Sequence, residues 1–146
     1  MKLGNKIAFK ITLFKEMNKF FQFNEYVEFG KVFMDCKAYL IALEHFDKAL
    51  ELSYLPLNKY RLLELFEHRG NINAHLLRYD KAIIDYSKAI EIEPENIDMI
   101  INRAISYEFL DKDQLALRDY EYAYYLDPNF KLAKYMVDYL YKKLKN

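Results

Sequence analysis

The hydrophobic positions of residues 63–130 repeat with a period of 34 residues. The repeated pairs are Ala82 and Ala116, Tyr86 and Tyr120, Ala89 and Ala123, and Pro94 and Pro128. A self-match at a fixed period indicates a repeat architecture, and this period is typical of stacked helix-turn-helix units. We therefore expect an all-α protein built from antiparallel helix pairs.

An earlier and more divergent copy precedes these two repeats. Its helices are predicted at Asn24–Cys36 and Tyr39–Ser53. Six extra residues then separate it from the next copy, and Asn58 is a good N-cap for a helix that they would lengthen. The predicted segments are 1–22 (N-terminal amphipathic helix), 23–56 (repeat 1), 57–62 (insert), 63–96 (repeat 2), 97–130 (repeat 3) and 131–146 (C-terminal capping helix).

Both ends of the chain show apolar residues at helical spacing. In residues 131–146 an apolar flank opposes lysines, as expected of a helix that covers the last open face of a solenoid. In residues 1–22 the apolar positions run from Leu3 to Phe21. That segment has two interpretations, a cap on the first repeat or a dimerisation helix.

The repeated residues resemble the signature of the tetratricopeptide repeat (TPR) family: a bulky residue, a Leu-Gly pair, an aromatic, an Ala with an aromatic four residues later, and a Pro. The two clear copies read Phe66, Arg69-Gly70, Asn73, Ala82, Tyr86, Pro94 and Ile100, Arg103-Ala104, Tyr107, Ala116, Tyr120, Pro128. The resemblance implies a TPR-type α-solenoid, a right-handed superhelix that serves as a protein-binding scaffold. Arg in place of Leu and Asn73 in place of the aromatic imply altered contacts between helices.

Two such contacts can be predicted. Arg69 and Asp85 are 16 residues apart, as are Arg103 and Asp119, so each pair should meet across the helices of one repeat as a partly buried ion pair. Small residues such as Gly30 and Gly70 should lie where paired helices press together, because a larger side chain would separate them.

The charges of the chain are unevenly distributed. The formal net charge is zero, which argues against a nucleic-acid or membrane-surface protein. Residues 1–22 hold five lysines and one glutamate, and residues 131–146 hold five lysines and one aspartate, so the region between them is acidic. Cys36 is the only cysteine, which we interpret as a small buried hydrophobe in a reducing compartment. With no signal peptide or membrane span recognisable, a cytoplasmic protein is expected.

No pattern of catalytic residues is present. The chain lacks a Gly-rich phosphate loop, a nucleophile elbow and a His-Glu-x-x-His sequence. His68 and His75 would lie roughly 10 Å apart along one helix, too far to share a metal ion without other ligands. We therefore expect no enzyme activity, no cofactor and no metal.

The resemblance directs attention to the inner face of the superhelix, which the first helix of each repeat lines. The candidate ligand-groove residues are Glu64, Glu67, His68, Asn71, Asp98, Ile101, Asn102, Ile105, Glu108, Phe109, Tyr135, Met136 and Tyr139. One half of this groove is acidic and the other is apolar. The Lys, Asn and Arg residues with which some TPR domains hold a chaperone C-terminal carboxylate are not found at the matching positions, which include His68, Asp98 and Asn102.

These observations favour a non-enzymatic interaction module, an adaptor or co-chaperone-like protein, that exists as a monomer or weak homodimer. Its partner would be a protein or peptide with apolar anchors and basic flanks. We expect it to bind neither a membrane nor a nucleic acid. Alternatively, the apolar patch only holds the last helix in place. Two further alternatives are a unit that self-assembles through its N-terminal helix or basic ends, and RNA binding through the last helix.

Overall fold

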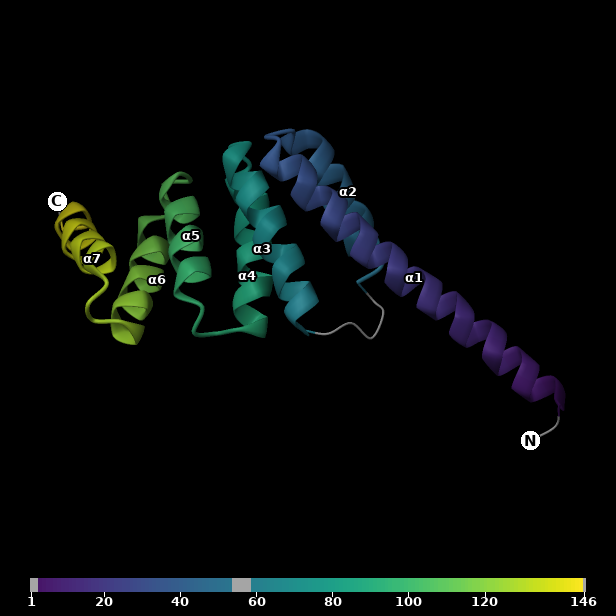
Figure 1. Cartoon of the computed structure of the whole chain (residues 1–146). Coiled ribbons are helices and arrows are strands. Elements are labelled where there is room, and N and C mark those ends of the chain that lie inside the picture. Colours follow the sequence, from purple (N-terminus) through teal and green to yellow (C-terminus); the bar gives the residue numbers. More distant parts are fainter. Residues whose placement is uncertain (1–2, 54–58, 146) are drawn as a thin grey trace. The chain divides into compact units, whose positions relative to one another are not determined.

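The computed structural model describes residues 3–53 and 59–145, with side chains from Phe9 onward, and these residues form helices and turns without a strand. The helices are α1 (Leu3–Asp35), α2 (Tyr39–Glu51), α3 (Lys59–His75), α4 (Tyr79–Ile92), α5 (Ile97–Glu108), α6 (Asp113–Leu126) and α7 (Lys131–Lys143) (Figure 1). The all-α class expected from the repeat is confirmed. The chain divides into two compact units, Met1–Leu65 and Phe66–Asn146, which are described separately.

In the first unit, α2 packs beside the C-terminal half of α1 (Figure 1). Phe23 and Val27 of α1 and Phe46 of α2 are fully buried. The expectation of separate helices at 1–22 and Asn24–Cys36 is wrong, because α1 is continuous from Leu3 to Asp35. Neither Pro nor Gly lies near residue 22, so nothing in the local sequence ends the helix there.

The described N-terminal part of α1 does not form a cap. The helix continues beyond the end of α2, and apolar side chains such as Phe14 and Phe21 are 72% and 60% exposed (Figure 1). Within the first unit, the predicted packing of this segment on the first repeat is therefore not realised.

The insert lengthens the following helix in the part of it that the structure describes. Residues 59–62 form the first turn of α3, whereas Leu57 and the predicted N-cap Asn58 lie outside the described residues. Helix α3 has 17 residues, against 12 in α5, the first helix of the third repeat.

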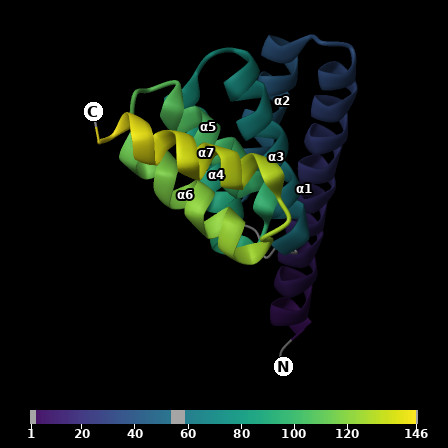
Figure 2. The ribbon, with the colours of Figure 1, turned by 90° about the vertical axis from the view of Figure 1, so that its left-hand side faces the viewer.

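In the second unit, α4 to α7 are stacked in chain order, and Figure 2 shows α7 nearest the viewer. Its core includes Ile100, Ala104, Ala116 and Tyr120, and Leu140 of α7 is fully buried in the same cluster. The segment predicted to cap the solenoid therefore forms a helix over Lys131–Lys143 that packs on α6, and the predicted division of the chain into repeats and cap stays a prediction.

The turn between the two helices of each repeat has the same geometry three times. Lys37, Leu77 and Asp111 adopt left-handed φ angles of 58°, 59° and 55°. In each turn the following amide donates to a carbonyl five residues earlier, as from Ala38 to Phe33 at 2.8 Å. This is the Schellman ending of a helix, and it reverses the chain within a few residues.

Small residues lie where the paired helices approach most closely. A Cβ atom added to Gly30 would lie 2.7 Å from the ring of Phe46, and one added to Gly70 would lie 2.7 Å from the ring of Tyr86. The predicted close approach is thus confirmed in two repeats.

Cys36 is exposed in the turn after α1, so its interpretation as a buried hydrophobe is wrong. The helix ends at Asp35, one residue earlier than predicted, which leaves Cys36 outside the packed face.

Candidate functional site

A buried ion pair joins the two helices of the second repeat. Arg69 Nε on α3 donates to both oxygens of Asp85 on α4, at 3.0 and 3.1 Å, and Asp85 is 1% exposed. Asn73 Nδ2 donates to the same carboxylate at 3.0 Å. The Asn that replaces the usual aromatic therefore completes a hydrogen-bonded network around Asp85.

The third repeat contains the equivalent pair with different neighbours. Arg103 Nε and Nη2 each donate to one oxygen of Asp119 at 2.7 Å, and Nη1 donates to Ser87 of α4 at 3.1 Å. The hydrogen bond to Asp119 raises the pKa of Arg103. Both predicted intra-repeat ion pairs are confirmed, and they fix the helices that carry the candidate groove residues.

A small pocket of about 370 Å³ opens on α5 of the second unit, lined by Ile105, Glu108 and Phe109. Phe109 is 62% exposed, and one face of its ring stacks on Tyr79 at a centroid distance of 4.3 Å. All three lining residues were predicted from the sequence. Tyr79 was missed, and its only sequence signal is an aromatic residue at the start of the second helix, as at Tyr39.

Two polar candidates, Glu108 of the pocket lining and Asn71 on α3, accept hydrogen bonds from buried tyrosines. Tyr120 donates its hydroxyl proton to Glu108, and Tyr86 donates to Asn71 Oδ1 at 2.9 Å. Asn102 Nδ2 also approaches Asn71 Oδ1, at 3.4 Å. Burial raises the pKa of Tyr86 and of Tyr120, and the hydrogen bond to Glu108 raises that of Tyr120 further. Both phenols are therefore protonated donors at neutral pH.

The predicted apolar patch divides into buried and exposed members. Ile101 is only 6% exposed and belongs to the core, while Ile105 and Met136 are partly buried against the same core. Phe109 is exposed, as are Tyr135 and Tyr139, whose rings stack at 6.5 Å on α7. Part of the patch thus packs in the core with α7, as the alternative interpretation expected, and part is exposed.

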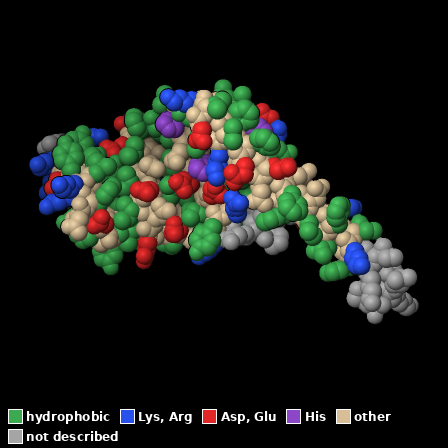
Figure 3. Space-filling view, viewed as in Figure 1, with side chains coloured by type: hydrophobic (Ala, Val, Ile, Leu, Met, Phe, Trp, Pro, Cys, Tyr) green, Lys and Arg blue, Asp and Glu red, His purple; other side chains and the backbone are tan. Residues whose placement is uncertain are grey.

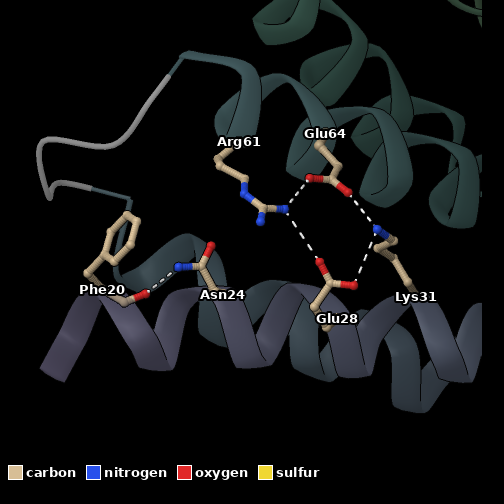
Figure 4. Close-up of polar contacts among 6 residues, drawn as sticks. All are labelled: Phe20, Asn24, Glu28, Lys31, Arg61 and Glu64. Atoms are coloured by element: carbon tan, nitrogen blue, oxygen red, sulfur yellow. Dashed lines mark hydrogen bonds and ion pairs between the residues drawn. The ribbon is translucent and has the colours of Figure 1, made fainter. Parts of the chain in front are cut away.

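Glu64 must be removed from the candidate groove charges. It lies in the first unit, where its carboxylate accepts hydrogen bonds from Lys31 at 2.7 Å and Arg61 at 2.9 Å (Figure 4). Glu28 pairs with the same two cations, at 3.4 Å from each. The charge of Glu64 is balanced inside its own unit, so it is not free to attract a basic ligand.

The remaining candidates lie in the second unit. Asp98 is exposed in the first turn of α5, and Glu67, His68 and Asn71 are half-buried on α3. Over this unit, the face seen in Figure 3 shows acidic side chains interspersed with hydrophobic ones. Their role in binding a ligand stays a prediction.

The described residues contain neither a cluster of side chains that could hold a metal ion nor a helix that could span a membrane. Among them, no three His, Cys, Asp or Glu side chains lie close enough together to hold an ion. None of the helices, within those same residues, combines the length and hydrophobicity that crossing a bilayer requires.

Comparison with known proteins identifies the fold. No family model matches the chain. A crystal structure of a tetratricopeptide repeat protein from Parabacteroides merdae is 28% identical, with a TM-score of 0.72 over 86% of this chain and 48% of that one. The first TPR domain of Spaghetti (RPAP3), bound to the HSP90 peptide SRMEEVD, is 20% identical, with a TM-score of 0.70 over 86% of this chain and 94% of that one. The chain has the TPR fold.

Similarity to a curated relative is found over a shorter stretch of the sequence. Mouse sperm-associated antigen 1 is 30% identical over 81 residues, which are 56% of this chain. The match spans only 9% of that relative, so what the whole relative does is not carried over to this chain.

Proposed function

We propose that this chain is a protein-interaction module that binds a peptide or partner helix on the inner helices of its second unit. The observation that carries the proposal is the pocket of Ile105, Glu108 and Phe109, where an exposed aromatic ring adjoins a carboxylate. An apolar anchor would fill the pocket, and a Lys or Arg beside the anchor would meet Glu108. Asp98 on α5 and Glu67 on α3 are further carboxylates of the predicted inner face.

The proposed mode of binding follows from the aromatic and acidic side chains that this unit exposes. Phe109 and Tyr135 present ring surface to solvent, and aromatic side chains that become buried at an interface often carry a large share of the binding energy. The carboxylates add little affinity but select the sign of the flanking charge. The Spaghetti (RPAP3) domain, which has the same fold, is bound to a chaperone peptide. This similarity supports peptide binding as the class of function.

The test uses two synthetic amphipathic peptides with identical Phe and Leu anchors, one flanked by Lys and the other by Glu. Fluorescence anisotropy should show binding of the Lys-flanked peptide only. Phe109→Ala should weaken that binding about tenfold or more. Tyr125→Ala, which truncates an even more exposed aromatic side chain on α6, at 78% exposure, should leave the binding unchanged. Equal binding of both peptides, or equal effects of both substitutions, would contradict the proposal.

A further inference from the structure

The N-terminal part of α1 has the chemistry that the proposed pocket selects. Its exposed side chains alternate large apolar residues with lysines. The exposed apolar residues of this segment are Phe9, Ile11, Leu13, Phe14, Met17, Phe20 and Phe21. In the same segment, residues 9–22, there are three lysines and one glutamate. Apolar anchors with basic flanks thus occur within the chain itself.

We infer that α1 of one copy docks on the pocket of Ile105, Glu108 and Phe109 in a second copy. This inference rests on the proposed function and names its partner. The first argument is charge: residues 1–22 are basic, whereas the region 23–130, which contains the pocket, has 20 acidic and 12 basic residues. Opposite net charges of the two surfaces favour their association.

The second argument is the position of Lys10. It precedes Leu13, Phe14 and Met17 by three, four and seven residues, so it lies on the same face of the helix as these apolar side chains. A lysine within an apolar face opposes insertion into a lipid surface, where basic residues lie on the opposite, polar face. The pocket has the complementary composition, because the carboxylate of Glu108 shares its lining with the apolar side chains of Ile105 and Phe109.

The third argument is the exposure of the segment. Seven large apolar side chains on about four turns of helix form a contiguous apolar surface of the kind that marks an interaction site. Figure 3 shows hydrophobic side chains and lysines along the described N-terminal part of α1. Within the first unit these side chains remain uncovered.

The geometry of such a contact has a consequence for assembly. The docking surface on α1 and the pocket are different patches, so a one-way contact leaves one free α1 and one free pocket and grows into rings or chains. A reciprocal pair, in which each α1 fills the pocket of the other copy, closes as a dimer. Sedimentation velocity of the full chain between about 1 μM and 1 mM should show a mass that rises with concentration and falls with added salt.

The decisive experiment mixes two variants that each lack one side of the contact. Phe14→Glu removes the anchor on α1, and Phe109→Glu removes the pocket; both side chains are exposed, so circular dichroism should show both variants folded. Each variant alone should be a monomer. Their equimolar mixture should form one species of two chains, twice 17.7 kDa, which cannot grow further. Tyr125→Glu, on α6, should assemble like the unmodified chain.

Other outcomes overturn the inference. If Phe109→Glu alone still assembles and Phe14→Glu does not, the contact is between two α1 helices. If the full chain is monomeric at every concentration, no second copy docks. If it is monomeric but binds vesicles of anionic phosphatidylglycerol, and Phe14→Glu abolishes this, the partner of α1 is a lipid surface.

A peptide of residues 9–22 separates this inference from the proposed function. It should bind the Phe14→Glu variant, whose pocket is intact, and a peptide with Lys10→Glu should bind about tenfold more weakly. If the designed Lys-flanked peptide binds through Phe109 but the 9–22 peptide does not, the proposed function stands and the inference fails. If neither binds, both fail.

Discussion

Arg69 and Asp85 form a buried bidentate pair at the place where Phe29 contacts His45 in the first repeat. Phe29 and His45 are also 16 residues apart, and their rings lie 5.7 Å apart. Phe33, four residues after Phe29, stacks on His45 with the ring centroids 5.2 Å apart. The equivalent contact in the second repeat is the hydrogen bond from Asn73 to Asp85. One structural position is therefore filled by an aromatic cluster in one repeat and by an ion pair in two others.

The two ion pairs should contribute differently to stability. Asp85→Ala would leave Arg69 without its carboxylate and Asn73 without its acceptor, and should destabilise the fold by about 3–5 kcal/mol. Asp119→Ala should destabilise it less, because the side chains of Asp119 and Arg103 are 10% and 21% exposed, against 1% and 13% for Asp85 and Arg69. Urea unfolding measures both effects. The control is Glu91→Ala, which breaks the exposed pair with Lys88 and should change little. A loss for Asp85→Ala no larger than that of the control would contradict the prediction.

Gly70→Ala tests whether close packing outweighs helix propensity. In a helix interior, Ala in place of Gly is favourable by about 1 kcal/mol. Here the added Cβ would lie 2.7 Å from the Tyr86 ring, which is 2% exposed and has little room to move, and 3.3 Å from Asp85 Cβ. Overpacking of this kind costs about 1–3 kcal/mol, so we expect net destabilisation. Thermal unfolding should show a lower Tm for Gly70→Ala, and a Tm equal to or above that of the parent chain would show that the helices separate easily.

Acid should weaken the ion cluster of the first unit. Burial acts to raise the pKa of Glu64, but hydrogen bonds from Lys31 and Arg61 outweigh it and leave the pKa below its ordinary value of 4.5. A carboxyl whose pKa is lowered by folding stabilises the folded state above its unfolded pKa, and this contribution is lost as the pH falls through the folded value. The free energy of unfolding should therefore fall below about pH 4.5, and it should fall less in Glu64→Gln. Parallel pH profiles of the two proteins would contradict this.

Glu67→Lys should change the kinetics of ligand binding more than its affinity. Glu67 is half-buried on α3, and a carboxylate near a binding site mainly accelerates the approach of a basic ligand. With the Lys-flanked peptide, stopped-flow measurements should show slower association and a weaker dependence on salt.

Ile105→Glu should reduce the affinity for the same peptide instead. Because Ile105 also packs against the core, the Tm of this variant must be measured in parallel. If the loss of binding only follows a loss of folding, Ile105 has a structural role.

Peptides that end in the acidic sequence of chaperones should not bind specifically. The Spaghetti (RPAP3) domain binds SRMEEVD, but the matching inner positions here include Asp98 and Asn102 and lack the required cations. Repulsion between like charges disfavours such a complex. Calorimetry with SRMEEVD and its C-terminal amide checks this. Saturable binding at micromolar concentration that amidation abolishes would show that the inner face has been assigned wrongly.

Regular spacing was sufficient to predict much of the fold. The 34-residue period indicated the paired helices, the small residues Gly30 and Gly70 between them, and the ion pairs at Arg69 and Arg103. These features depend on contacts within one repeat, where a fixed number of residues along two helices fixes the distance between side chains. The pocket residues Ile105, Glu108 and Phe109 were predicted for the same reason, since they share one helix face.

Other features depend on contacts that spacing does not encode. Ile101 is buried because it joins a core cluster with Leu140 of α7, and the charge of Glu64 is balanced partly by Lys31, which reaches it from α1. The continuity of α1, by contrast, is a local property, because no residue near position 22 ends a helix, although the repeat alignment suggested a boundary there. The sequence alone determined which residues share a helix face. Only the tertiary structure decided which of those faces are covered, because burial depends on the packing of segments that are distant in the chain.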